Sequence, residues 1–134
     1  MALAKDTQLP VHEGSYADHP VLTNVKIYEG AVVSVDANGF AKPYAGTDTF
    51  FAGIARKQAD NTGGANGAIK VQVRRDVHHR EVTLASAAQA DVGDLLYASD
   101  DGTFTKTSTS NLLVGRIHAF VKANTIIARF EPSV

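Results

Sequence analysis

Five histidines are the side chains in this sequence best suited to metal binding or proton transfer: His12, His19, His78, His79 and His118. Imidazole is a common zinc ligand and titrates near neutral pH. On a strand, however, the adjacent His78 and His79 point to opposite faces, so the two cannot hold one ion together. The spaced His-x-His pair of metal-binding jelly rolls does not occur in the sequence. The histidine pattern therefore predicts no metal site.

Two aspartate- and glycine-containing segments resemble the beginning of a calcium loop. They are residues 36–39 and 100–102, and both lack the further spaced carboxylates and the closing Glu that complete such a loop. Turn formation explains them better, because an Asp side chain can accept a hydrogen bond from the backbone two residues on. We predict a tight turn in each segment, with Gly39 and Gly102 at positive φ.

The remaining catalytic motifs are also missing. The glycine-rich residues 63–67 have neither the Lys-Ser/Thr of a phosphate loop nor a helix behind them, and we interpret them as a flexible connection. No Gly-x-Ser-x-Gly elbow occurs. The absence of cysteine excludes a disulfide framework, a thiolate zinc site and a cysteine nucleophile. We predict a protein that is not an enzyme, with no catalytic residue, no cofactor and no bound metal.

Residues 74–80, Arg-Arg-Asp-Val-His-His-Arg, form the one charge cluster of the chain. Two interpretations stay open: a solvated loop, or a docking patch for an acidic partner, because the guanidinium group of arginine pairs with carboxylates in two-pronged fashion. The candidate interface residues are Arg74, Arg75, His78, His79 and Arg80.

Composition limits the possible partners. The 134 residues are 44% hydrophobic and 20% charged, which is typical of one globular domain with its own core. A net charge of −1 argues against a nucleic-acid partner, because such proteins neutralise many phosphates. No apolar run approaches the roughly 20 residues that span a bilayer, and the first residues lack a basic region followed by an apolar segment. We expect a soluble, unexported protein with no membrane partner.

The segments that must position these side chains occur twice in the sequence, as two similar copies. Residues 30–41 match residues 93–104 at an offset of 63, and residues 50–56 match residues 112–118 at an offset of 62. Asn61-Thr62 matches Asn124-Thr125 at the first offset, 63. A duplicated unit and a chance likeness between β-hairpins both account for the pattern. A duplication would produce a pseudo-symmetric barrel or two facing sheets.

Short β-prone runs separated by turn residues predict an all-β fold. Residues 68–74 alternate most clearly, and Gly53 inside a strand marks a bulge or a close backbone approach. The alanine-rich residues 85–90 are long enough for one helical turn only. We predict a compact antiparallel β-sandwich or small, jelly-roll-like barrel with pseudo-repeated hairpin units, formed by residues 25–134 as a single domain. Residues 1–24 are predicted to be an extended N-terminal arm, either frayed or ordered against a neighbouring subunit.

A family resemblance rests on the order and spacing of several segments, which together cover about residues 26–131. They are Gly30-Ala31-Val32-Val33 with Asn38-Gly39, Phe51-Ala52-Gly53-Ile54-Ala55, Asp60-Asn61-Thr62-Gly63-Gly64 with Ile69-Lys70-Val71-Gln72-Val73, Val92-Gly93-Asp94-Leu95-Leu96-Tyr97 with Asp101-Gly102, and Val114-Gly115-Arg116-Ile117. In these segments the chain resembles the capsid cement, or head decoration, proteins of tailed bacteriophages. The long N-terminal arm departs from the shorter starts of that family.

The resemblance implies a viral structural protein. Such proteins are small all-β domains that bind the outside of the phage head between major capsid protein subunits and stabilise the shell. The resemblance also implies that the partner is the major capsid protein and that the chain forms a homo-oligomer, with a trimer favoured over a dimer. The implied location is the outer capsid surface of the virion, after assembly in the host cytoplasm. The alternatives are a carbohydrate- or ligand-binding β module and a cupin-type metalloenzyme.

Overall fold

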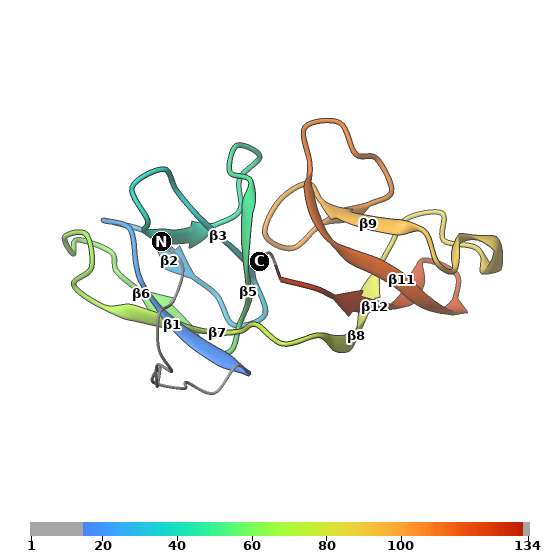
Figure 1. Ribbon diagram of the computed structural model, residues 1–134, viewed down its shortest axis with the longest axis horizontal. Coiled ribbons are helices and arrows are strands. Elements are labelled where there is room, and N and C mark those ends of the chain that lie inside the picture. The colour runs from blue at the N-terminus through green and yellow to red at the C-terminus, as the bar shows by residue number, and fades with distance from the viewer. Residues whose placement is uncertain (1–14, 133–134) are drawn as a thin grey trace, which may run out of the picture.

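The computed structural model describes residues 15–132 and shows an all-β chain of antiparallel strands (Figure 1). About 48% of the chain is strand, and the two five-stranded sheets are open at their edges. The fold prediction of an antiparallel sandwich is therefore confirmed, whereas a closed barrel is not formed. A single 3-10 turn, η1 (Gln89–Asp91), begins at the end of the alanine-rich segment. Within the described residues, no helix has the length and apolar character needed to cross a bilayer.

The first sheet is built from the first half of the chain. Its strands in spatial order are β1 (Tyr16–Pro20), β7 (Lys70–Arg74), β5 (Phe50–Ala55), β3 (Val32–Val35) and β4 (Ala41–Pro43). The alternation of residues 68–74 has the expected effect, because Val71 and Val73 are buried while Lys70 is exposed.

The second sheet is built from the second half of the chain. Its strands in spatial order are β8 (His78–Thr83), β12 (Thr125–Phe130), β11 (Leu112–Lys122), β9 (Leu95–Ala98) and β10 (Phe104–Thr105).

The two sheets have the same strand order, so that β1, β7, β5, β3 and β4 correspond to β8, β12, β11, β9 and β10. Matching hydrogen bonds support the correspondence. The amide of Gly30 donates to the carbonyl of Ala55 at 2.8 Å, and the amide of Gly93 donates to that of Ile117 at the same distance. A chance likeness between hairpins does not give one order for five strands. The repeat in the sequence is therefore a repeat in the fold.

The third sequence match, between Asn61 and Asn124, is wrong. Asn124 precedes β12, whose counterpart β7 begins at Lys70, so residues between β5 and β7 are an insertion in the first half. This insertion contains β6 (Ala59–Asp60), which pairs with β2 (Lys26–Ile27) in a small separate sheet. Its glycine-rich loop, expected to be a flexible connection, is anchored by buried Asn61, whose amide donates to the carbonyls of Leu22 at 2.9 Å and Ala65 at 3.0 Å.

The predicted boundary of the N-terminal arm at residue 24 is also wrong. Residues 16–20 form β1, which pairs with β7 from Tyr16 opposite Arg74 to Pro20 opposite Lys70. Val21 is fully buried in the core of the first half. The segment has little apolar alternation of its own, and its hydrogen bonds to β7 hold it in place as a strand. The part of the predicted arm before residue 15 lies outside the described residues.

Two hydrophobic clusters hold the fold together, and they are not equivalent. One belongs to the first half alone and includes Val33 and Val73. The other joins both halves: Phe51 and Ile54 of β5 pack in it with Phe130 of β12. The first sheet is therefore buried on both faces, and Figure 1 shows its strand β5 beside the second half.

The glycine predictions were half right. Gly39 has a φ of +88°, as expected for its turn, but Gly102 is not among the residues with positive φ. Asp100 instead forms the second turn by accepting hydrogen bonds from the amides of Gly102 at 2.8 Å and Thr103 at 2.7 Å. Gly53 confirms the predicted close approach, because a β-carbon there would collide with the carbonyl of Arg74.

Candidate functional site

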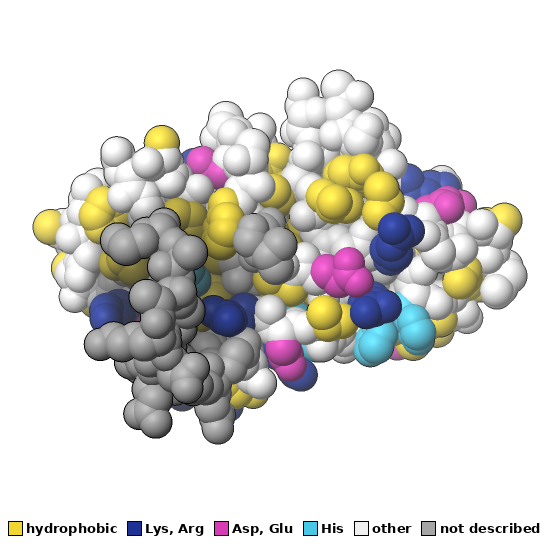
Figure 2. Space-filling view, in the orientation of Figure 1, with side chains coloured by type: hydrophobic (Ala, Val, Ile, Leu, Met, Phe, Trp, Pro, Cys, Tyr) yellow, Lys and Arg dark blue, Asp and Glu magenta, His cyan; other side chains and the backbone are white. Residues whose placement is uncertain are grey.

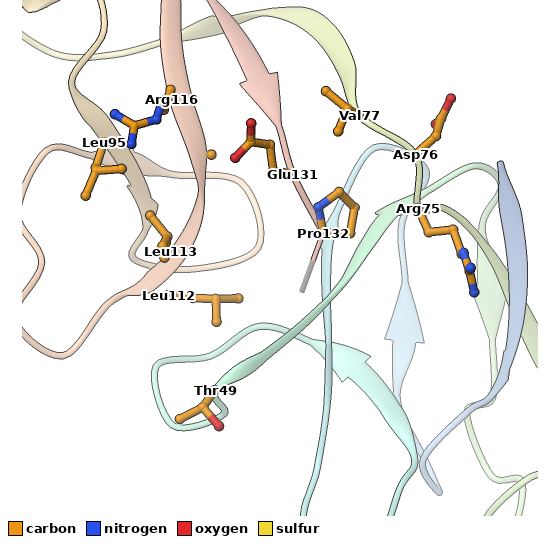
Figure 3. A pocket seen from close by; sticks show the side chains of 11 residues that line it. Thr49, Arg75, Asp76, Val77, Leu95, Leu112, Leu113, Arg116, Glu131 and Pro132 are labelled. Atoms are coloured by element: carbon orange, nitrogen blue, oxygen red, sulfur yellow. The ribbon is translucent and has the colours of Figure 1, made fainter. Parts of the chain in front are cut away.

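A groove of about 740 Å³ lies where the two halves of the chain meet (Figure 3). Residues from both halves and from the segment that connects the two sheets line it. They are Thr49, Arg75, Asp76, Val77, Leu95, Leu112, Leu113, Gly115, Arg116, Glu131 and Pro132. The groove therefore depends on the folded arrangement of the whole chain.

One wall of the groove is apolar and open to solvent. On this wall Leu95 of β9 and Leu113 of β11 are 37% and 47% exposed, and across the groove Val77 of the connecting segment is 51% exposed. Figure 3 shows the leucine side chains on the second half, across the groove from Val77. Exposed aliphatic side chains that are grouped in this way are typical of a protein-binding surface.

Charged side chains surround this apolar wall. The guanidinium group of Arg116 donates to the carbonyl of Gly93 at 3.0 Å, which fixes it beside Leu95. Glu131 forms an ion pair with Arg129 at 3.2 Å. The rim therefore carries both signs of charge around an apolar centre, as the rim of a protein interface does.

The connecting segment contributes a second ion pair. Arg74 Nε donates to Asp76 Oδ1 at 2.8 Å, and this hydrogen bond is the main cause that holds the pKa of Asp76 below its ordinary value. Arg74 is thus engaged within its own segment. A partner that pairs with Arg74 must compete with Asp76.

The outward face of the second sheet continues from the groove; we define it as Leu95, Tyr97, Leu113 and Arg116. Figure 2 shows hydrophobic side chains gathered on this half of the molecule, beside basic, acidic and histidine side chains. Further along the same sheet, the rings of His79 and His118 lie against each other, with centroids 4.3 Å apart and planes tilted by 48°. The surface thus changes from aliphatic to histidine side chains along the sheet.

The structure separates the five candidate interface residues that the sequence places together. Arg75 lines the groove, and its amide donates to the carbonyl of Ser15 at 3.0 Å. His79 is exposed, and Arg80 is half-buried on β8 opposite Ala128. Arg75, His79 and Arg80 remain candidates for contact with a partner; they are called the basic segment below.

His78 does not belong to an exposed patch, which corrects the prediction that included it. Its side chain is 3% exposed, and its ring lies 5.5 Å from that of Phe130. Nδ1 lies 2.9 Å from the carbonyl oxygen of Asp76, which can only accept, so Nδ1 donates. Nε2 is buried without a hydrogen-bond partner among the described residues, and burial is the main cause that lowers the pKa of His78. The two adjacent histidines face opposite sides of the strand, as the sequence predicts.

No described residues gather three or more histidine and carboxylate side chains in a way that could hold a metal ion. His12 lies outside the described residues. His19 is partly buried on β1, where burial and then the charge of Arg75 lower its pKa. Between residues 15 and 132, therefore, no histidine cluster offers a route to metal chemistry.

Sequence reasoning missed the apolar wall of the groove. No surface that contains Leu95 and Leu113 was predicted from the sequence. A signal was present, because each strand reads as a continuous apolar run with aliphatic residues at both phases. Such a run predicts that the strand is buried on both faces. An exposed face of such a strand departs from that prediction.

Comparison of the chain with protein-family models, with curated protein sequences and with solved structures gives no match.

Proposed function

We propose that the protein is a structural component of a tailed-bacteriophage head: a cement protein that binds the outer capsid surface between major capsid protein subunits and stabilises the shell. The observation that carries this proposal is the exposed apolar wall of Leu95 and Leu113, with exposed Val77 across the groove and a rim of both charges. This composition is that of an assembly surface rather than of an enclosed reaction site. The ordered sequence segments that resemble capsid cement proteins point the same way.

The duplicated fold suits such a role. A head offers many symmetric copies of one site, and a homo-oligomeric cement that engages several sites needs only modest affinity at each. Because the net charge is only −1, docking depends on local charge patterns rather than on a strong overall electrostatic field.

The basic segment is the proposed contact with the shell. Arg75 and His79 are exposed, and Arg80, which faces the opposite side of β8 from His79, is half-buried. Two arginines in this position can pair with carboxylates on an acidic capsid surface. The partner in this proposal is the major capsid protein, and the place of action is the virion exterior.

Binding of the purified protein to expanded, undecorated heads tests the proposal. Heads are titrated with the protein, sedimented, and assayed for bound protein and for resistance to heat or low salt. Saturable binding with a fixed number of copies per head, together with delayed rupture, is the expected result. Binding that stays proportional to protein concentration, with unchanged rupture, would refute the proposal.

A ligand-binding β module is the second candidate, and the volume of the groove favours it. About 740 Å³ falls within the range of small-molecule sites. The groove-lining residues include no aromatic side chain, so a glycan that stacks on a ring is poorly accommodated. A screen of apolar carboxylates and amines by thermal shift distinguishes this function, since a raised melting temperature that Leu113→Glu abolishes would favour it.

A further inference from the structure

The two halves of the chain have diverged at almost every position of their corresponding strands. When these strands are aligned by their pairing registers, only two positions carry the same residue type in both halves: Gly53 with Gly115, and Arg74 with Arg129. Close packing of the backbone explains the glycines, because a β-carbon there would collide with the carbonyl group of the arginine. That contact involves only the main chain of the arginine. It does not explain why the side chain is the same in both halves.

An acidic residue two positions further along the chain holds each of these arginines. Nε of Arg74 lies 2.8 Å from a carboxylate oxygen of Asp76, and Nε of Arg129 lies 3.2 Å from one of Glu131. The two arginine side chains are 39% and 46% exposed. Ion pairs that are this open to water contribute little to folding stability. Stability therefore does not account for the presence of the same pair in both halves.

An aromatic ring on an edge strand lies beside each of the two arginines. Tyr16 of β1 is the cross-strand partner of the first arginine, and His79 of β8 is that of the second; Figure 1 shows β1 beside β7 and β8 beside β12. Each ring contacts a further nitrogen-bearing side chain. The guanidinium group of Arg56 lies 4.4 Å from the centre of the Tyr16 ring, and the ring centroids of His118 and His79 are 4.3 Å apart. Arg56 and His118 occupy equivalent positions in the repeat.

The two halves therefore present one arrangement twice on their surfaces. The first patch consists of Tyr16, Arg56, Arg74 and Asp76, and the second patch consists of His79, Arg116, His118, Arg129 and Glu131. Arg116 belongs to the second patch because it is the cross-strand partner of Arg129 on β11. Each patch has two arginines and one acid. This excess of positive charge, carried by planar guanidinium groups, fits a partner that offers carboxylates.

We propose that the two patches are equivalent binding sites, and that each takes the same carboxylate-bearing segment of the major capsid protein, so that one chain joins two neighbouring subunits. This inference rests on the proposed function and names the contacts that serve it. Because the acid of each patch already engages its arginine, a carboxylate of the partner must compete with that acid, and one patch alone binds weakly. Two weak contacts in one chain give firm binding, since the second forms at a high effective concentration.

Binding of the purified chain and its variants to expanded, undecorated heads tests the inference. The first-patch variant combines Arg56→Gln with Arg74→Gln. The second-patch variant combines Arg116→Gln with Arg129→Gln. Each variant removes both positive charges of one patch and leaves the other patch intact.

We expect each patch variant to raise the apparent Kd for heads at least about a hundredfold, because the loss of either contact removes the advantage of joining the two. The two increases should be similar, and the combination of all four substitutions should abolish saturable binding. An increase in only one variant would overturn the equivalence of the patches. Unchanged binding by both variants would overturn the inference while the proposed function stands. A wild-type chain that does not bind heads would overturn both.

The matched control combines Lys57→Gln with Lys122→Gln, which removes one exposed positive charge from each half outside the patches. Its Kd should stay close to that of the wild type, and an increase as large as in the patch variants would refute the inference in favour of a general charge effect. Thermal unfolding checks that all variants are folded. If a glutamine variant melts early, lysine at the same positions replaces it, which keeps the charge but loses the two-pronged guanidinium group. The lysine variants should bind at least about tenfold more weakly than the wild type, and wild-type affinity would contradict the proposed contact.

Discussion

Gly115 lies against the main-chain carbonyl group of Arg129 on the neighbouring strand, with no room for a β-carbon between them. Gly53 has the same relationship to Arg74 in the first sheet. The φ angles are +156° and +144°, in a region that side-chain-bearing residues rarely adopt. The duplicated fold therefore depends on the same close approach in each half, at the point where the register shifts.

Gly115→Ala is expected to destabilise the fold strongly, because the new methyl group collides with backbone and the residue keeps a strained φ. Strain of this kind costs about 1–3 kcal/mol and overpacking adds a similar amount, so the free energy of unfolding should fall by roughly 3 kcal/mol or more. Urea denaturation measures the loss. Gly53→Ala should lower the free energy of unfolding by a similar amount. A loss below about 1 kcal/mol for both, within the range of ordinary surface substitutions, would contradict the contact.

The two hairpin turns allow a matched comparison. Gly39 has φ +88°, whereas Gly102 has no positive φ, and neither has atoms within 4 Å of a new β-carbon. Gly39→Val should therefore cost about 1–3 kcal/mol from backbone strain alone. Gly102→Val should stay within roughly 0.5 kcal/mol of the wild type, as surface substitutions do. Thermal unfolding of the two variants side by side checks this, and equal melting temperatures would refute the difference between the turns.

The sequence was most informative where residues determine their own local structure. The alternation of Val71 and Val73, the Asn38-Gly39 turn and the interruption at Gly53 each predicted the structure that forms. These signals operate over a few residues, through side-chain period and backbone freedom. They also revealed the repeat, because turn residues keep their spacing when the strands between them diverge.

The sequence was least informative where another part of the chain decides the outcome. Residues 16–20 form a strand only because β7 offers its edge, and Phe51 is buried only because the second half covers it. His78 was assigned to an interface because charged neighbours surround it, yet strand alternation turns it into the core. Long-range contacts of this kind leave no local pattern. The groove could not be predicted for the same reason, since both halves and their connecting segment line it.

Stability is expected to fall on mild acidification because of His78. Its pKa in the folded chain lies below the ordinary 6.5, chiefly because burial penalises the imidazolium form. As the pH falls below about 6.5, the unfolded chain therefore binds the proton first, and the stability present above that pH declines until the folded pKa is reached. Each unit by which the pKa is lowered is worth about 1.4 kcal/mol.

His78→Phe is expected to flatten this dependence, because its ring can keep the contact with Phe130 without a titrating nitrogen. The measurement is the free energy of unfolding in urea at pH 7.5 and at pH 5, for wild type and variant. His19, whose pKa is also lowered, should leave a residual slope. His79→Gln is the control, since His79 is exposed. If wild type and His78→Phe lose the same stability between the two pH values, the buried imidazole is not responsible.

Charge reversal in the basic segment tests its proposed contact with the shell. Arg75→Glu combined with Arg80→Glu replaces two attractions to an acidic surface by two repulsions, and we expect at least a tenfold higher Kd for undecorated heads, or about 1.4 kcal/mol. Lys57→Glu, at an exposed site just beyond β5, is the single-charge control. Unchanged shell binding by the double variant, with its melting temperature also unchanged, would show that the shell contacts another surface.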